Sequence, residues 1–477
     1  MWRFEATPLH HRNGRWVRRA RIEVRVSGAR IEQIRPLMTG RNTDKWVMLP
    51  GFHDSHVHLR AAAAARLSVD LSVAGSIPAL LAILQTSVAE FNGRWIRGWG
   101  WDESALRERR APTVAEIDAI TNGHPCALHH RTGKVVLLNS TARRILAGAG
   151  DETAPTGELV RADDPSLLRM PRQREQSLES SLNALSRELA AMGLTSVTEA
   201  SATNTWDDIA QYETWVNRGV IRQRVNALLA VDQVSAVARN RERTPSRGGV
   251  RVLGAKVAAP SDGIAECVRH ARGFGWPVAV HATEPDELEA ALVAIEASGP
   301  PAWGRDRIEH LGLPLPGQLE RIKATGTAVT TNPAFLTERA PKYRELLSPV
   351  EQEWLYPVAS VISHGIPMAG ASDRPVTVAT PLDTMSAAVY RRRRGSGTEP
   401  LGVRERITPD DALGLITDKD EVDGPSREGW NHRRASHSPW SRTADTVVLG
   451  DDPRRMLEQT QVMATFVGGC MMWRREK

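Results

Sequence analysis

Short apolar runs alternate with longer helical patterns through the middle of the chain. In residues 180–200, SSLNALSRELAAMG has the apolar spacing of a helix, and LTSVTEA follows as a strand. The same order recurs in residues 264–284 and 315–332, with a glycine between helix and strand. Such repeats are typical of a parallel sheet with crossover helices. We therefore predict an α/β fold, a (β/α)8 TIM-like barrel with its chemistry at the carboxyl ends of the strands.

Both ends of the chain have a different, β-rich pattern. Residues 22–34 alternate apolar and polar positions around a Ser27-Gly28 turn, which predicts a hairpin. Residues 444–450 and 462–469 give two further strand signals. We expect the two ends of the chain to form one small β-sandwich domain, with the barrel sequence lying between them. The predicted bounds are 1–49 plus 436–477 for the sandwich and 50–435 for the barrel, with a loop over 418–441.

Composition limits the class of protein. With 41% hydrophobic and 25% charged residues in 477, the chain has the balance of an ordinary globular protein rather than a disordered one. No run approaches the roughly 20 apolar residues of a membrane span, and the first residues lack a signal-peptide core. The three cysteines are far apart in the sequence, which suits a reducing compartment. We expect a cytoplasmic protein without a membrane partner.

The chain carries a net charge of +6, which raises the question of a polyanion partner. The excess is spread along the sequence, and Arg391 to Arg394 is its only dense run. We interpret that run as the decoration of a solvated helix end. Nucleic acid is therefore not the expected partner, since binding it would require a contiguous basic face.

The strongest local signal for chemistry is an H-x-H motif at the end of an apolar strand. In WVMLPGFHDSHVHL, His56 and His58 are two positions apart, so in a strand both imidazoles point to the same face. Together they can reach one ion in the mouth of a barrel. The motif alone is weak evidence, because two surface histidines after a strand would look the same.

Three further candidates stand where predicted strands end. His281 closes PVAVH, His310 closes RIEH, and Asp373 follows IPMAGAS. All three are expected in the same layer of the barrel as the H-x-H pair. Imidazole and carboxylate ligands without thiolate suit Zn²⁺, and Mn²⁺, Fe²⁺ and Ni²⁺ also fit this donor set.

Several motifs match a known family in order and spacing: LPGFHDSHVHL, WIRGWGWDE, GLTSVTEA, RIEHL, GASDRP and ADTVVLGDDP. Through them the sequence resembles the amidohydrolase superfamily over nearly the whole chain. The resemblance is to amidohydrolase family 3, the branch that includes the N-substituted formamide deformylases. It implies an insertion in the barrel, around residues 70–150, that carries WIRGWGWDE.

The resemblance also implies a ligand set. His56, His58, His281 and His310 would bind metal, and Asp373 would serve as both ligand and general base. A strand-borne lysine, carboxylated by CO₂ to a carbamate, would bridge two ions, and Lys256 in RVLGAKVAAPSDG is the suitable candidate. Burial lowers the pKa of a lysine, and its neutral amine can react with CO₂. The alternative is an amine that snorkels out of a strand end.

These expectations define a function. We expect one or two metal ions that generate a hydroxide, which attacks an amide, formamide or related C–N bond of a small-molecule substrate. A lactonase or other ester hydrolase would use the same site. A non-catalytic scaffold that retains the fold is the alternative of a different class. A homodimer is left open.

Four residues are candidates for substrate binding. Trp101 and Asp102 lie in the segment that resembles the family insertion, although a tryptophan is more often simply packed. Lys134 in RTGKVVLLNS stands where the family usually has a histidine that faces the substrate. Glu199 lies at a strand end, where it could contact substrate or a cation, or could be a solvated loop carboxylate.

Overall fold

The computed structural model describes most of the chain. The described residues are 1–12, 15–37, 46–91, 95–147, 159–161, 167, 169–171, 174–239, 246–247, 250–417 and 444–476. The loop predicted over 418–441 lies outside them. The chain forms two compact units: the first comprises Met1–His58, Ser186–Asp373 and Ala379–Lys477, and the second comprises Leu59–Leu185 and Arg374–Val378.

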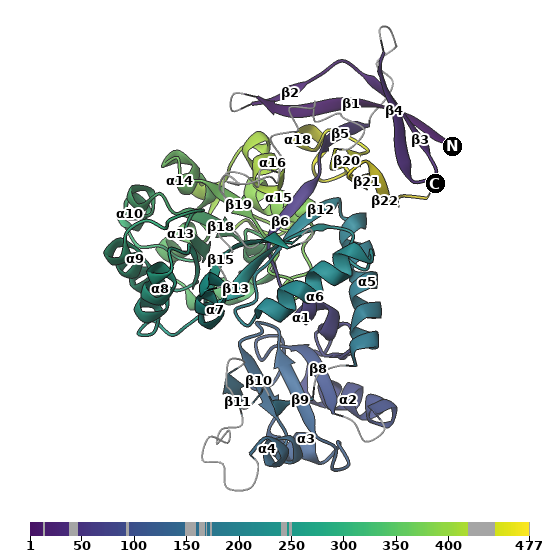
Figure 1. Ribbon diagram of the computed structural model, residues 1–477. Coiled ribbons are helices and arrows are strands. Elements are labelled where there is room, and N and C mark those ends of the chain that lie inside the picture. Colours follow the sequence, from purple (N-terminus) through teal and green to yellow (C-terminus); the bar gives the residue numbers. More distant parts are fainter. Residues whose placement is uncertain are drawn as a thin grey trace. The chain divides into compact units, whose positions relative to one another are not determined.

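Eight parallel strands of the first unit form a nearly closed barrel, which confirms the predicted fold class (Figure 1). In spatial order they are β6 (Phe52–Val57), β12 (Leu194–Glu199), β13 (Arg224–Ala230), β15 (Val250–Val257), β16 (Val278–Ala282), β17 (Arg307–His310), β18 (Ala328–Thr331) and β19 (Met368–Gly370). The backbone N–H of Asp373 donates to the carbonyl of His56 at 2.9 Å. This bond brings the chain beyond β19 against β6, so the two ends of the strand order meet.

Helices follow the barrel strands as predicted, and Figure 1 shows several of them around the outside of the barrel. In α8, Ile264, Val268 and Ala271 are buried at helical spacing, so one stripe packs inward. None of the described helices has the length and apolar character needed to cross a bilayer. The helices of this unit include α6 (Trp206–Asn217), α7 (Val234–Arg239), α8 (Ile264–Gly273), α9 (Pro285–Ser298), α10 (Gln318–Thr325), α11 (Phe335–Glu338), α12 (Ala340–Leu346), α13 (Pro349–Trp354), α14 (Val358–Ser363), α15 (Pro381–Tyr390), α16 (Pro409–Thr417) and α18 (Pro453–Met456).

Strands from both ends of the chain share one sheet, which has eight strands in the part of the chain that the structure describes, as the predicted fold class requires. The predicted hairpin forms around Ser27-Gly28, and Gly28 supplies the positive φ of the turn. Phe4 and Phe466, from opposite ends of the sequence, stack in its core with ring centroids 6.5 Å apart. In spatial order the strands are β2 (Arg15–Arg18), β1 (Trp2–Arg12), β3 (Ile22–Ser27), β4 (Arg30–Pro36), β22 (Cys470–Arg474), β21 (Val462–Val467), β20 (Thr446–Leu449) and β5 (Val47–Pro50).

The second unit has its own sheet and its own core. The described part of this sheet has five strands, in the order β11 (Leu159–Arg161), β10 (Val135–Leu138), β9 (Cys126–His130), β8 (Ile96–Trp101) and β7 (Val69–Asp70). Leu80 and Leu84, from one helix, pack with Leu128 in the core of this unit. Its helices are α1 (Leu59–Ala65), α2 (Ile77–Phe91), α3 (Val114–Asp118) and α4 (Ser140–Ala147), and α5 (Glu175–Ala191) leads back toward the barrel sequence.

The arginine run is only in part the solvated helix end that we predicted, because Arg393 is exposed and Arg391 is buried. Arg391 is only 1% exposed and ends α15 with a φ of 56°. Its guanidinium donates to the carbonyls of Leu355, Tyr356 and Leu401 at 2.6, 3.0 and 2.9 Å. The interpretation was wrong for Arg391, because its acceptors come from other segments of the chain, which a charge pattern cannot reveal.

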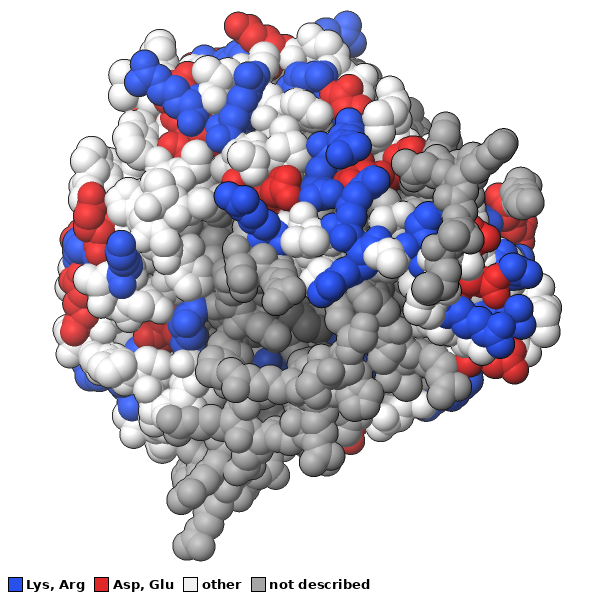
Figure 2. All heavy atoms as spheres, turned by 90° about the horizontal axis from the view of Figure 1, so that it is seen from above, with Lys and Arg blue, Asp and Glu red and all other residues white. Residues whose placement is uncertain are grey.

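Basic and acidic side chains are interspersed on the face drawn in Figure 2. Several arginines among the described residues have carboxylate partners. Arg18 lies 3.1 Å from Asp452, and Arg392 lies 2.7 Å from Glu458. Local pairing of this kind offsets part of the basic excess.

The contact between Asp445 and Arg224 gives a test of how the terminal sheet is attached. The Asp445 carboxylate accepts from Arg224 at 2.6 and 3.2 Å and from the backbone N–H of Gly468 at 2.7 Å. Asp445→Ala should lower the free energy of unfolding by about 1–3 kcal/mol, because it removes the acceptor of a part-buried guanidinium. Urea unfolding measures this, with the exposed Asp262→Ala as control. Equal midpoints for the two variants would contradict the expectation.

Candidate metal centre

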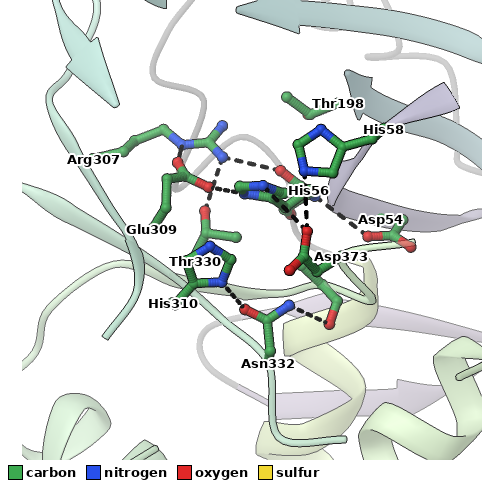
Figure 3. A network of polar contacts seen from close by, with 12 residues as sticks. Asp54, His56, His58, Thr198, Arg307, Glu309, His310, Thr330, Asn332 and Asp373 are labelled. Carbon is green, nitrogen blue, oxygen red and sulfur yellow. Dashed lines mark hydrogen bonds and ion pairs between the residues drawn. The ribbon is translucent and has the colours of Figure 1, made fainter. Parts of the chain in front are cut away.

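The structure brings all five of the predicted histidine and aspartate ligands together at the carboxyl ends of barrel strands. His56 lies in β6 and His58 follows it, His281 lies in β16, His310 ends β17, and Asp373 follows β19. Ring centroids are 5.1 Å apart for His56 and His58, 4.8 Å for His56 and His310, and 4.6 Å for His281 and His310. Figure 3 shows His56, His58 and His310 around Asp373. Their role as metal ligands remains a prediction.

Asp373 is the centre of this arrangement. Its Oδ1 lies 3.1 Å from Nε2 of His58 and 3.6 Å from Nε2 of His56. Potential ligand atoms of these three residues lie within 4.8 Å of one another, close enough to hold one ion. Asp373 has a φ of 59°, a conformation that is costly for a residue other than glycine. Such strain is typical of residues whose position is fixed for function.

The ring orientation of two histidines is fixed by neighbours at Nδ1. His56 Nδ1 contacts the Glu309 carboxylate, and His310 Nδ1 lies 2.7 Å from Oδ1 of Asn332. Asn332 donates its amide to the carbonyl of Ala371 at 3.0 Å, so its Oδ1 is the atom that accepts from His310. Each ring then carries its proton on Nδ1. The lone pair on Nε2 is left for a metal ion.

His58 is held by a different chain of contacts. Its Nδ1 lies 3.1 Å from Oγ of Ser201, whose backbone N–H donates to Glu199 at 3.0 Å. Burial lowers the pKa of His58, but Asp373 and Glu199 outweigh it and leave that pKa raised. Glu199 itself is fully buried, so the alternative of a solvated loop carboxylate is wrong. Its role in substrate binding remains a prediction.

Lys256 points into the protein rather than out of a strand end. The residue is 4% exposed, and its Nζ is buried without a hydrogen-bond partner among the described residues. Burial lowers the pKa of Lys256 to about 8, although Glu309 and Asp373 act in the opposite direction. The snorkelling alternative is therefore wrong. A buried amine without a partner costs free energy, so a bound group that completes its bonding would fit here.

The buried imidazoles are in the form that binds metals. Burial lowers the pKa of His56 to about 4 and that of His310 to about 3. Both rings are therefore neutral near pH 7. A metal ion competes with protons for these nitrogens. Because the two imidazoles are already neutral, no free energy is spent on removing a proton when an ion binds.

Two residues that we did not single out from the sequence, Arg307 and Glu309, form a hydrogen-bonded pair beside His56. Arg307 donates through Nε to Glu309 at 2.8 Å, and through Nη2 to Ser55 O and Thr330 Oγ1 at 2.9 Å each. Burial raises the pKa of Glu309, but Arg307, His56 and Lys256 outweigh it and hold that pKa well below its usual value. The signal was present in RIEH, where two opposite charges lie two positions apart in a strand and so share one face.

The backbone beyond β17 bends sharply, and this bend places His310. His310 has a φ of 77° and Leu311 a φ of 48°. At the next position, a Cβ on Gly312 would lie 2.3 Å from the carbonyl oxygen of Thr283. Only glycine fits so close to that carbonyl. The sequence His-Leu-Gly therefore permits a turn that any other residue at Gly312 would obstruct.

Three predicted substrate residues belong to the second unit, which we describe by itself. Trp101 is 2% exposed and donates its indole N–H to the carbonyl of Leu128 at 3.0 Å, so it packs in the core. Asp102 accepts from Ser104 at 2.6 and 2.9 Å. Lys134 is exposed. Roles for these three in substrate binding remain predictions.

A substitution at Glu309 tests whether the carboxylate tunes His56. Glu309→Gln should weaken metal binding about 10–100-fold, because the neutral amide no longer supports the Nδ1 proton and leaves Arg307 without its buried partner. Competition with a chromophoric chelator measures the affinity. The exposed Glu266→Gln on α8 is the matched control. Identical affinities in the two variants would show that Glu309 has no part in metal binding.

Comparisons with known proteins agree with the geometry. The profile of the amidohydrolase family matches residues 46–421. An N-substituted formamide deformylase of Arthrobacter pascens is 24% identical, with 90% of this chain and 88% of that protein covered. YtcJ of Bacillus subtilis is 23% identical, with 90% and 89% covered. An uncharacterized metal-dependent hydrolase from Pyrococcus horikoshii OT3 has the same fold, with a TM-score of 0.70 at 19% identity and coverage of 95% and 98%. The resemblance seen in the sequence is thus confirmed, and the chain belongs to the amidohydrolase family.

Proposed function

We propose that this protein is a metal-dependent hydrolase that cleaves an amide, formamide or related C–N bond of a small molecule. One observation carries the proposal. A buried lysine amine that has no hydrogen-bond partner among the described residues shares the end of the barrel with four histidines and an ionised aspartate. A purely structural cluster would have no reason to leave that amine unsatisfied.

The donor set fits a divalent ion of the zinc type. His56, His58, His281, His310 and Asp373 would hold the ion, or two ions if Lys256 carries a CO₂-derived carbamate. When bound, a divalent ion supplies Lewis acidity, which polarises a carbonyl group and acidifies water. Nitrogen and oxygen ligands without thiolate favour Zn²⁺, and they also suit Mn²⁺, Fe²⁺ and Ni²⁺.

Asp373 is the group that moves the proton. Burial raises its pKa, but His58, His310 and His56 outweigh it and keep that pKa lowered, so the carboxylate is ionised. It accepts a proton from the attacking water as the water oxygen bonds to the carbonyl carbon. As the C–N bond breaks, the same proton passes to the leaving nitrogen. The products are a carboxylic acid and an amine.

A substrate panel with an Asp373 variant tests the proposal. The metal-loaded protein should hydrolyse at least one member of a panel of N-formyl and N-acetyl amines. Asp373→Asn should keep most of the metal and lose turnover about 100-fold or more, because a carboxamide cannot accept the proton. Liberated amine and metal content are measured on the same samples. Esters and lactones in the panel are the alternative substrates: turnover of these alone would replace the C–N assignment, and wild-type rates in the variant would remove Asp373 from the reaction.

Replacing Lys256 tests the bridge. Wild-type protein incubated with ¹³C-bicarbonate and Zn²⁺ should show a lysine carbamate signal by ¹³C NMR, and Lys256→Ala should not. The variant should also bind fewer ions per chain, because the anionic bridge is missing. Lys323→Ala on the exposed face of α10 is the control. If Lys256→Ala retains two ions, a carbamate on Lys256 is not what holds them, and the bridge fails as part of the proposal.

A further inference from the structure

A second polar cluster lies next to the candidate metal centre, in the segment that follows β18. This segment contains α11, α12 and α13, and the cluster consists of Arg339, Tyr343 and, just beyond α13, Tyr356. Loops at the carboxyl end of barrel strands are where such folds place residues that contact substrate. None of these three side chains was singled out from the sequence, and the reaction proposed above does not use them.

Ring stacking ties this cluster to the metal centre. The Phe335 ring stacks on the His310 ring, with centroids 6.2 Å apart and planes 17° from parallel. Arg339 places its guanidinium carbon 4.1 Å from the centroid of the same Phe335 ring. Tyr356 meets that ring edge-on at 5.8 Å. Phe335 therefore contacts both the guanidinium of Arg339 and the ring of His310.

Tyr356 is held in a costly backbone conformation at this place. Its φ is 46°, and its hydroxyl lies 3.2 Å from the hydroxyl of Tyr343. Its backbone N–H donates to the carbonyl of Gly312 at 2.8 Å, just beyond His310. The carbonyl of Tyr356 accepts from the buried guanidinium of Arg391 at 3.0 Å. Strain that is fixed from both sides in this way commonly marks a position that serves a ligand.

Arg339 brings a positive charge that the described residues do not pair. The side chain is half-buried, and among the described residues no carboxylate lies within salt-bridge distance of it. Burial lowers the pKa of Arg339, but Tyr343, Tyr356 and Asp373 outweigh it and leave that pKa raised. The guanidinium is therefore charged, and its planar fork of donors suits a carboxylate.

We propose that Arg339, together with the hydroxyls of Tyr343 and Tyr356, binds a carboxylate carried by the substrate. This inference rests on the proposed hydrolase and narrows its substrates to acylated amines that bear an acid group some distance from the bond cleaved. Phe335 supplies a flat wall between the guanidinium and His310. Arg391 is a positioning residue, since it fixes the backbone from which the Tyr356 hydroxyl reaches the cluster.

Paired probes test the inference. They are the N-formyl and N-acetyl derivatives of glycine, β-alanine and 4-aminobutyrate, each as the free acid and as the primary carboxamide. Binding to the metal-loaded protein is measured by calorimetry, and hydrolysis is measured separately by amine release. Wild-type protein should prefer at least one acid over its carboxamide by about tenfold or more, because only the acid makes a charged pair. The chain length that gives the largest preference reports the spacing between the two sites.

Variants assign the preference to Arg339. Arg339→Met should reduce the acid-to-carboxamide ratio to near one, and Arg339→Lys should retain part of it, because the charge remains while the fork is lost. Tyr356→Phe should lower the ratio less. Arg344→Met, at an exposed arginine in α12, the helix that Arg339 immediately precedes, is the matched control and should keep the wild-type ratio. Wild-type melting temperatures for all four variants establish that they fold.

The outcomes separate this inference from the proposed function. A preference for acids that Arg339→Met abolishes supports the carboxylate site, whether or not any probe is hydrolysed. Binding of the acids without hydrolysis of any probe would count against the proposed hydrolase activity and not against the carboxylate site. Equal binding of acid and carboxamide by wild-type protein overturns the inference, whatever the turnover. Retention of the preference in Arg339→Met also overturns it and leaves Arg339 as a packing residue on Phe335.

Discussion

Glu309 is completely buried, with Arg307 on one side and His56 on the other. An isolated carboxylate in such a place would be very costly, so the charge persists only because cations and hydrogen bonds surround it. Arg307 in turn bonds to Ser55 O of β6 and to Thr330 of β18. The Arg307–Glu309 pair of β17 is therefore linked to both β6 and β18. The orientation of His56 depends on it directly.

The same carboxylate also shapes the electrostatics above it. Lys256, His56 and Asp373 are all buried, and they interact with one another or with Glu309. Burial keeps His56 neutral, while the two carboxylates oppose the effect of burial on Lys256. The result is a set of neutral and ionised donors suited to a divalent cation. Positive φ values at His310 and Asp373 are the conformational cost of directing those side chains inward.

The candidate ligands could be predicted because their signals are local. His56 and His58 share a strand face through their spacing, and His281, His310 and Asp373 each end a short apolar run. In a parallel barrel such ends converge, so the topology alone brings these residues together. Lys256 was identifiable from the family resemblance, and its direction into the protein required the structure.

What the sequence could not provide depends on contacts between distant segments. The Nδ1 partner of His56 is Glu309, which is 253 positions away. Arg391 looked like a solvated charge because its acceptors at Leu355 and Tyr356 belong to another loop. The surroundings of Arg339 depend on aromatic rings that come from β17, α11 and α12 and from the loop between α13 and α14. Periodicity describes which face is buried, and it does not tell which polar atoms meet there.

The central claim is that Lys256 and the histidines around Asp373 form a metal centre. The most direct measurement is a crystal structure of the Zn²⁺-loaded protein with data collected at the zinc absorption edge. We predict an anomalous peak about 2.0–2.2 Å from Nε2 of His56 and of His58, with density continuing beyond Nζ of Lys256 into a carbamate. An anomalous peak away from these histidines, or no peak in crystals grown with excess Zn²⁺, would contradict the account.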